Sequence, residues 1–488
     1  LDGNYPVGTG NVALGDAAMN GSISGNYNTA VGQVAGTALT SGRKNAFFGS
    51  YTADANTTGS NNTAIGQAAF SANTTGDSNT AVGNDALISN TTASNNTAVG
   101  YKAAHFNTTG DLLVAVGSQS LYSNTTGERN TATGWYSLVL NTTGSYNTAF
   151  GNQALYANTT ASNNTAVGYQ AGYSNTTGYD DVYLGNQAGY TSSTGLGNIA
   201  VGSKALFSNT ADLNVAIGST QSAFGIKGAL ETNTTGSVNV AISTGALGLN
   251  TTGSNNVAIG YRSLYSNTTA SNNTALGYQA GYSTTTGFNN TIFGHLAGHA
   301  NTTGQRNAYI GQGAGYSMTT GSKNTIIGSY NGNQGGLDIR TSSNNIVLSD
   351  GDGNPRIMYT AGTGPRMFGM SSGAGTNTLK YNNGTGVITF DTSSRRYKDN
   401  IRDSVYGLSA VNQMRSTMFE YKDSGTTDVG LIAEEMNEII PELVGKNSDN
   451  QPDSVSYDRL VSVLIKAVQE LSTQNDTLTD RITALEGN

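Results

Sequence analysis

Short apolar runs recur along the chain at a fixed distance, and each run ends at a glycine. Val, Ile, Leu or Phe stands directly before the glycine, as in Val31, Phe48 and Ile65. A small residue follows three positions after the glycine, as in Ala35 and Ala69. We predict a short β-strand at the apolar run, and a second short strand or a bend at the small residue.

The glycine marks a seventeen-residue repeat, as the step from Gly15 to Gly32 illustrates. Nineteen copies follow one another, with one shorter step from Gly202 to Gly218 and one longer step from Gly218 to Ser243, which takes the place of the glycine. The long step contains an insertion, which we place at residues 219–235. Most copies close with N-T-T-G, which predicts a turn because Gly adopts positive φ and Asn bonds to nearby backbone. The marker glycines are Gly15, Gly32, Gly49, Gly66, Gly83, Gly100, Gly117, Gly134, Gly151, Gly168, Gly185, Gly202, Gly218, Gly260, Gly277, Gly294, Gly311 and Gly328.

So short a unit cannot bury a face by itself, whereas stacked units bury one continuous core. We therefore expect a mainly β fold in which residues 1–330 form a β-solenoid or β-roll rod, with the insertion looping out. At about 4.8 Å per coil, 19 coils give a rod roughly 90 Å long.

The composition agrees with a repetitive β structure. The chain has 65 glycines, no cysteine and only 11% charged residues, and 26 tyrosines recur in register, unlike the tyrosine-poor composition of disordered chains. The absence of cysteine excludes a disulfide framework. A net charge of −8 disfavours a nucleic-acid partner. No apolar run reaches the ~18 residues of a membrane helix, so we expect no membrane insertion.

Three features of the repeat have alternative interpretations. N-x-T sequons, such as those at Asn73 and Asn107, are glycan acceptors in eukaryotic secreted proteins, but here we favour turns and stacked Asn/Thr ladders. His295 and His299 have a spacing that suggests a metal pair on a helix, yet they lie in a β repeat without a third ligand nearby, so we predict no metal and no cofactor. Recurrent tyrosines either form a sugar-stacking stripe or pack in columns between coils, which we favour. They include Tyr101, Tyr169, Tyr173, Tyr261, Tyr278 and Tyr282.

The repeat motif N-T-A-V-G-x-x-A resembles the S-V-A-I-G-x-x-A repeat of trimeric autotransporter adhesin heads. That family forms left-handed parallel β-rolls that associate as trimers. The resemblance covers residues 8 to about 330, although the repeat is longer here than in those adhesins. It implies a trimeric β-roll.

Residues 331–392 break the regular spacing of the repeat and predict a short β-strand neck. Two alternating segments, "NNIVLSDGDGNPRIMY" and "NTLKYNNGTGVITFDTS", contain D-G-D-G and N-N-G-T-G turns, which are hairpin signals. "DGDGN" is also similar to part of a calcium loop, but it lacks the remaining spacing and the terminal Glu. We favour a plain turn.

The last segment, residues 393–488, has a different composition. It holds 26 of the chain's Asp, Glu, Lys and Arg residues, against 28 in residues 1–392. We expect a small α+β domain with a helix within 401–420, a strand end and a helix before Pro441, and a coiled coil at 460–486. The coiled coil follows from an a/d heptad seam, which predicts self-association without fixing its stoichiometry. The seam consists of Leu464, Val468, Leu471, Asn475, Leu478, Ile482 and Leu485.

Three motifs in this segment, "SSRRYKDNI", "GLIAEEMNEIIPELV" and "SVSYDRLVSVLIKAVQEL", together resemble the C-terminal intramolecular chaperone of phage tail spikes and fibres, the endosialidase-type self-cleaving domain. That family helps a β-stranded trimer to fold and then cuts itself off with a serine–lysine dyad. The resemblance places the serine at Ser393 and the lysine at Lys398, while Ser394 stands where an aspartate is usual. The spacing of Ser and Lys alone carries no information.

Together the resemblances imply a homotrimeric phage tail fibre or spike, located in the virion, that binds a host cell-surface receptor such as a glycan or an outer-membrane component and joins other tail proteins. The only enzymatic activity expected is a single self-cleavage. A polysaccharide-degrading spike is disfavoured because glycosidases need paired carboxylates and the rod has few acids. A bacterial surface adhesin is disfavoured because that family ends in a membrane barrel.

Overall fold

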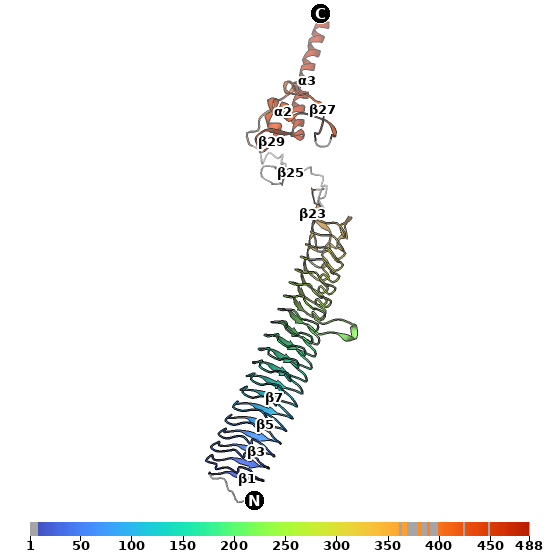
Figure 1. Cartoon of the computed structure of the whole chain (residues 1–488). Coiled ribbons are helices and arrows are strands. Elements are labelled where there is room, and N and C mark those ends of the chain that lie inside the picture. The colour runs from blue at the N-terminus through green and yellow to red at the C-terminus, as the bar shows by residue number, and fades with distance from the viewer. Residues whose placement is uncertain are drawn as a thin grey trace. The chain divides into compact units, whose positions relative to one another are not determined.

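The computed structural model describes residues 8–360, 364–367, 379–381, 388–390, 399–422, 425–447 and 449–487. The chain forms two compact units, residues 1–370 and residues 371–488 (Figure 1). The first unit is a β-roll, which confirms the mainly β repetitive fold.

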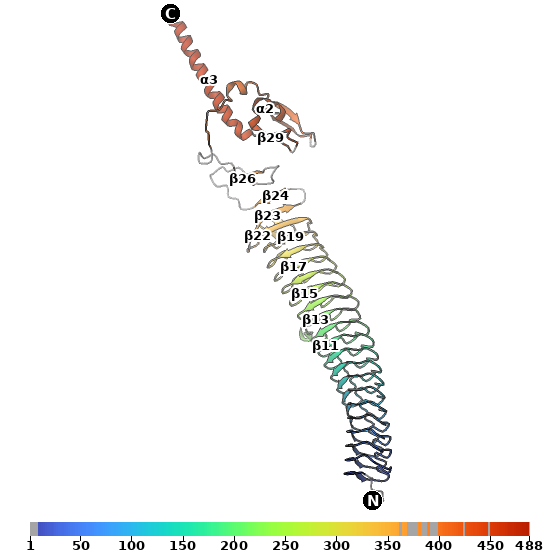
Figure 2. The same ribbon diagram turned by 90° about the vertical axis from the view of Figure 1, so that its left-hand side faces the viewer.

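Every coil of the roll contributes one three-residue strand. Each strand pairs in parallel and in register with the strand of the next coil, as in β4 and β5, where Ala64 lies opposite Ala81. Figure 2 shows the strands stacked along one side of the roll. The strands are β1 Val12–Leu14, β2 Thr29–Val31, β3 Ala46–Phe48, β4 Thr63–Ile65, β5 Thr80–Val82, β6 Thr97–Val99, β7 Val114–Val116, β8 Thr131–Thr133, β9 Thr148–Phe150, β10 Thr165–Val167, β11 Val182–Leu184, β12 Ile199–Val201, β13 Val215–Ile217, β14 Val240–Ile242, β15 Val257–Ile259, β16 Thr274–Leu276, β17 Thr291–Phe293, β18 Ala308–Ile310 and β19 Thr325–Ile327.

The rest of each coil is a series of bends, so the small residue after the glycine marks a bend and not a second strand. Three bends per coil use left-handed backbone, as at Asp85, Leu87 and Asn95, whose φ angles are 56°, 50° and 60°. Left-handed backbone costs a non-glycine residue roughly 1–2 kcal/mol. The fold offsets this cost by burying the Leu87 side chain and by bonding each coil to its neighbours.

Two buried ladders of asparagine join the coils. In the first ladder, Asn45 donates from its backbone N and from Nδ2 to Asn28 Oδ1, at 3.1 and 3.0 Å. In the second, Asn107 Nδ2 donates to Asn90 Oδ1 at 3.0 Å, and Asn90 Nδ2 donates to Asn73 Oδ1 at the same distance. The sequon asparagines therefore bond to each other in the interior, as the ladder interpretation predicted. A side-chain amide can do this because its NH2 group donates to one neighbour in the stack while its oxygen accepts from the other.

Aromatic rings form columns between coils, which confirms the second interpretation of the tyrosines for Tyr173, Tyr261, Tyr278 and Tyr282. Neighbouring rings in a column are nearly parallel, so each ring face is covered by the next ring, as between Tyr173 and Tyr190, whose centroids are 5.1 Å apart. His295 and His299 belong to two different columns, where each imidazole stacks on a tyrosine. The columns are Tyr156–Tyr173–Tyr190–Phe207, Tyr265–Tyr282–His299–Tyr316 and Tyr261–Tyr278–His295.

Two positions of each coil fill the core together: the middle residue of the strand and the fourth residue after the glycine. A large residue at one position is accompanied by a small residue at the other. Most coils place alanine at the buried middle of the strand, and many of these place leucine four residues after the glycine, as in Ala81 and Leu87. Where the strand carries a large residue, the second position is glycine in the same coil or in the preceding one: Tyr183 lies between Gly172 and Gly189. A Cβ at Gly189 would lie 2.2 Å from Tyr183 Cδ1, and Tyr309 stands in the same relation to Gly315.

The insertion leaves the roll as a small hairpin, visible as the green projection in Figure 1. Its tip is the 3-10 helix η1 (Ser222–Phe224), and a bridge joins Gln221 to Ile226. Glu231 is buried at the base, where it accepts from Lys227 Nζ at 3.1 Å and from the Gly228 N–H at 2.6 Å. The coil resumes at Ala229, because the Leu206 N–H bonds to the Ala229 carbonyl.

After β19, the hairpin β20–β21 (Asn333–Gln334 and Leu337–Asp338) precedes β22 (Asn345–Ser349). β22 pairs in parallel with β19, so the stack has a twentieth strand. β22 also forms an antiparallel hairpin with β23 (Pro355–Thr360), which pairs with β24 (Gly364–Met367). The D-G-D-G segment is a turn in which Asp350 accepts from the Asn354 N–H and pairs with Arg356, as predicted.

The second unit mixes short strands and helices. Its N-terminal part holds the hairpin β25–β26 (Leu379–Tyr381 and Ile388–Phe390). The following elements are α1 Leu408–Val411, β27 Thr417–Glu420, β28 Thr427–Gly430, α2 Ala433–Ile439, the 3-10 helix η3 Pro441–Leu443, β29 Val444–Lys446, β30 Pro452–Val455 and α3 Tyr457–Glu486. α2 stops before Pro441, as predicted, because proline lacks the N–H that the helix needs.

The exchange of volume between Tyr183 and Gly189 is testable by a double substitution. Tyr183→Ala leaves a cavity that costs about 3 kcal/mol, and Gly189→Leu alone forces its side chain into the Tyr183 ring. The double variant Tyr183→Ala/Gly189→Leu recreates the Ala–Leu pair of coils such as that of Ala81 and Leu87, so most of the loss in the thermal unfolding temperature is recovered. Additive losses in the double variant would contradict this account of the core.

Asp181 occupies a place in the first ladder that other coils give to asparagine. It is fully buried, and its Oδ1 accepts from the Asn198 N–H at 2.8 Å. In the preceding coil, Asn164 Nδ2 donates to the Gly178 carbonyl at 2.8 Å, whereas Asp181 Oδ2 finds no hydrogen-bond partner among the described residues. Burial raises the pKa of Asp181 to about 7, because removal from water disfavours the charged carboxylate relative to the neutral acid.

This pKa makes the stability of the roll depend on pH. Between about pH 4, the ordinary pKa of Asp, and pH 7 the folded chain keeps a proton that the unfolded chain has lost, so the free energy of unfolding falls as pH rises, in total on the order of 4 kcal/mol. Asp181→Asn should remove this slope, giving a higher unfolding temperature than wild type at pH 8 and a similar one at pH 4.5. The control is Asp180→Asn on the exposed neighbour, and an equal gain from both variants would contradict the assignment.

Candidate functional site

The predicted dyad, Ser393 and Lys398, lies outside the described residues, and so does Ser394. The description resumes at Asp399, directly after the predicted lysine. The candidate site can therefore be built from the folded part of the C-terminal unit, residues 399–487, which follows the dyad in the chain.

A small apolar core holds this part together. Ala410 of α1, Met436 of α2 and Leu443 of η3 pack with Val463 of α3. Residues from four elements that are separated in the sequence thus meet in one cluster. The long helix α3 is part of this core, because its first turns contribute Val463 and, on the same face, the buried Ala467.

A carboxylate of α3 fixes the start of α1. Leu408 donates its N–H to Glu470 Oε2 at 2.7 Å, although 62 residues separate them. The first turn of a helix has unsatisfied N–H groups, and α1 has no side-chain cap of its own, so Glu470 supplies the missing acceptor. Gly407 leaves room for it, since a Cβ there would lie 2.3 Å from Glu470 Oε2.

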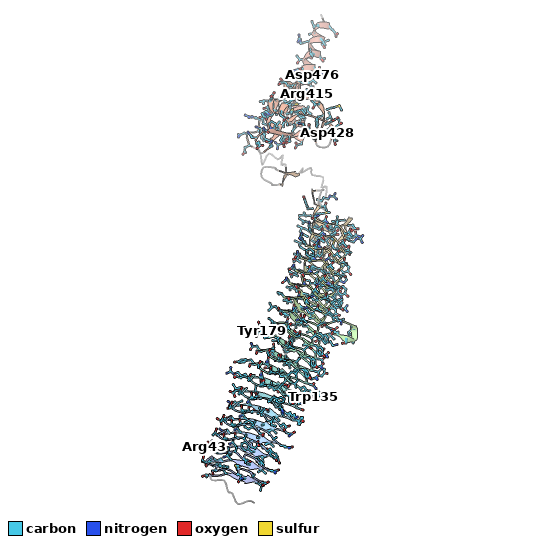
Figure 3. The ribbon with its side chains drawn as sticks, viewed as in Figure 1. Arg43, Trp135, Tyr179, Arg415, Asp428 and Asp476 are labelled. Carbon is cyan, nitrogen blue, oxygen red and sulfur yellow. The ribbon has the colours of Figure 1, made fainter. Side chains whose placement is uncertain are left out.

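Further polar contacts join the remaining elements. The Tyr406 hydroxyl donates to Glu442 Oε2 at 2.9 Å, and this hydrogen bond raises the pKa of Tyr406. Arg415 forms an ion pair with Glu435 of α2, which lowers the pKa of the Glu435 carboxyl. Figure 3 shows Arg415 on the compact part of the unit. Both pairs are exposed, so they serve to orient the elements and add little stability.

An open hollow of about 380 Å³ lies between β27, α2 and β30. Phe419 and Tyr421 line one side, and the carboxylates of Glu434 and Asp453 line another. The Tyr457 hydroxyl accepts from the Leu431 N–H at 2.7 Å and closes the floor. The lining therefore combines two aromatic rings with two acidic side chains.

α3 has a second, exposed apolar face. Its C-terminal half extends beyond the compact part of the unit, as Asp476 shows in Figure 3. The predicted a/d residues lie on this face: Leu464, Leu471 and Leu478 are 43%, 47% and 51% exposed, while Val463 and Ala467 face the core. The helix therefore has one face that packs within the chain and one that is open along its length.

The described residues contain no group of three His, Asp or Glu side chains arranged to hold a metal ion. None of the described helices has both the length and the apolarity that a membrane crossing requires. The site is thus made of a small folded unit, a shallow hollow and an open helix face.

Comparison with known protein families gives one match. Residues 393–445 match the family model of the chaperone of endosialidase. The matched segment begins at the predicted serine and includes the predicted lysine, α1, β27, β28, α2 and η3. No curated protein and no solved structure matches the chain significantly. The chain therefore combines a β-solenoid rod with a C-terminal segment that is similar to the chaperone of endosialidase over residues 393–445.

Sequence reasoning missed Glu470 and Tyr457, which organise the unit through contacts with Leu408 and Leu431. Both contacts join residues far apart in the sequence, so no local pattern indicates them. The only sequence signal for Glu470 is Gly407, a glycine inside the segment 401–420 where a helix was predicted, and this signal does not identify the partner.

The cap of α1 predicts a local effect of Glu470→Ala. Loss of an N-terminal cap costs about 1 kcal/mol, so hydrogen exchange at the Leu408 amide should become about fivefold faster while the β-roll is unchanged. Glu486→Ala, an exposed carboxylate at the end of the same helix, is the matched control. Unchanged exchange in Glu470→Ala would show that the contact does not hold α1.

Proposed function

We propose that the chain is a homotrimeric fibre or spike protein of a tailed phage, in which the rod presents a surface to the host cell and the C-terminal segment is its folding chaperone. The observation that carries this proposal is the match of residues 393–445 to the chaperone of endosialidase, directly downstream of a long β-solenoid. The receptor is a component of the host cell surface, and the remaining tail proteins are the other partners.

A chaperone suits the physical problem of the rod. The strands have three residues each, and three chains must start in the same register. Non-local β pairing is slow and leaves apolar edges exposed to aggregation. The open a/d face of α3 brings three C-termini together early and raises the effective concentration of the rods.

Once the coils have stacked, the C-terminal chaperone segment is no longer needed, and we propose that Ser393 and Lys398 remove it by self-cleavage. A serine hydroxyl is a weak nucleophile, and a lysine with a lowered pKa acts as its base in one variant of the serine mechanism. Lys398 Nζ takes the proton of Ser393 Oγ as this oxygen attacks the carbonyl carbon of the adjacent peptide bond. The proton then passes to the leaving amine, and water hydrolyses the resulting ester.

Intact mass and sedimentation of purified variants test both parts of this proposal. Wild type should give a trimer that has lost about 96 residues, the length of segment 393–488. Ser393→Ala and Lys398→Ala should give soluble trimers of full-length chains. Lys446→Ala, on an exposed lysine of β29, is the matched control and should be cut as wild type. A wild type that stays full length would refute the cleavage, and Ser394 would then be replaced by Asp.

Truncation tests the chaperone role separately. A chain that ends before Ser393 should be insoluble or fail to assemble, whereas wild type that has been cut after folding should stay assembled on heating. Normal trimers from the truncated chain would refute the need for a chaperone, whatever the outcome of the cleavage experiment.

A further inference from the structure

The outer face of the strand stack carries no charged residue, and its third position is apolar in every strand except β8. In each strand the middle residue points into the core, and the first and third point outward. Ile65, Val99 and Phe150 occupy the third position and are 42%, 36% and 57% exposed. The third positions of β1–β19, followed by the equivalent residue of β22, are Leu14, Val31, Phe48, Ile65, Val82, Val99, Val116, Thr133, Phe150, Val167, Leu184, Val201, Ile217, Ile242, Ile259, Leu276, Phe293, Ile310, Ile327 and Leu348.

No charged residue stands at either outward position of these twenty strands, which hold only Thr, Ala, Val, Ile, Leu and Phe. The charged residues of the roll lie in the bends instead, as Lys102 and Arg129 do. Figure 3 shows Arg43 and Trp135 at opposite edges of the roll. The strand face is therefore distinguished from the edges by chemistry as well as by geometry.

This face is large enough for a stable interface. Twenty strands about 4.8 Å apart, each with three residues of about 3.3 Å, make a surface of roughly 950 Å². The largest apolar patches on monomers are about 300–600 Å², whereas a stable protein interface buries about 800 Å² on each partner.

The period and length of the face indicate its occupant. Side chains recur every coil, so a partner that packs against the entire face must present apolar rows with the same spacing over the same length. A second copy of this roll meets both conditions. If the α3 seams of two copies associate in parallel, the rolls that precede them run in the same direction, which sets each coil opposite the same coil of its partner.

We propose that the outer strand face of β1–β19 and β22 is the surface through which copies of the roll pack against each other, in parallel and in register. This inference rests on the proposed trimer, and it adds which side of the roll faces inward and which edges remain free for other contacts. The bends, with their charged residues and aromatic columns, then form the outer surface of the assembly.

Cysteine cross-linking tests the face, because the chain has no cysteine of its own. Ile65→Cys and Ile310→Cys place a thiol on the third position near each end, and Thr97→Cys/Val99→Cys places thiols on both outward positions of β6. On mild oxidation of the assembled protein, these variants should form cross-linked dimers on a non-reducing gel. Thr109→Cys, an exposed residue of the N-T-T turn after β6, is the matched control and should stay monomeric on the gel.

The outcomes separate this inference from the proposed function. Trimers in sedimentation with cross-links only at Thr109→Cys would overturn the assigned face and leave the trimer standing. Cross-linking at β6 but not at Ile65→Cys or Ile310→Cys would overturn the parallel, in-register arrangement. Folded monomers without cross-links would overturn both. A charge on the face gives an independent measure: Val99→Asp should reduce the trimer fraction at least tenfold at low micromolar concentration, whereas Thr109→Asp should not.

Discussion

The structure depends on one constraint: equivalent residues of successive coils must lie in line along the axis of the roll. Asn45 bonds to Asn28, and Asn62 bonds to Asn45, because equivalent residues lie in line in successive coils. The alignment is kept across the 16-residue step as well, where the Asn214 N–H donates to Asn198 Oδ1. A buried amide without a partner costs about 1–3 kcal/mol, so a slip of one residue would leave both ladders unpaired along the rod. The same alignment stacks the aromatic rings and places each strand beside its equivalent. The interior thus requires that the ladder residues align, and a coil of another length fits where the extra or missing residues lie between the ladders, as in the 16-residue step to Asn214.

This constraint explains why much of the fold could be predicted from the sequence. The regular period predicted the coils and their number to within one strand, because periodicity is visible without any knowledge of contacts. It placed the insertion at residues 219–235, whereas the regular coil already resumes at Ala229. The ladder and column interpretations of Asn107 and Tyr173 followed from the same alignment. We predicted a second strand or a bend after the glycine, and the structure has bends with left-handed backbone there, as at Leu87. Leucine rarely adopts positive φ, so nothing in the sequence indicated this backbone conformation.

The candidate site was less predictable. The helix α3 and the end of α2 before Pro441 followed from local patterns, and the resemblance of the tail agrees with the family match over 393–445. Contacts such as Glu470 with Leu408 join distant parts of the chain, so they required the fold. Ser393 and Lys398 were assigned from the resemblance alone, and the roles given to them stay predictions.

The ladders have a consequence for how the rod can change in evolution. The upper surface of one coil matches the lower surface of nearly every other, so duplication or loss of one copy alters the reach of the rod by about 5 Å without requiring a new fit. Nearly identical stretches such as "SNNTAVGY" at residues 94–101 and 162–169 give recombination the matching sequence it needs. Coils with a bulky centre are the exception. Tyr183 must travel together with Gly172 and Gly189, so the heritable unit there is a pair of neighbouring coils, and the length of the rod changes in larger steps.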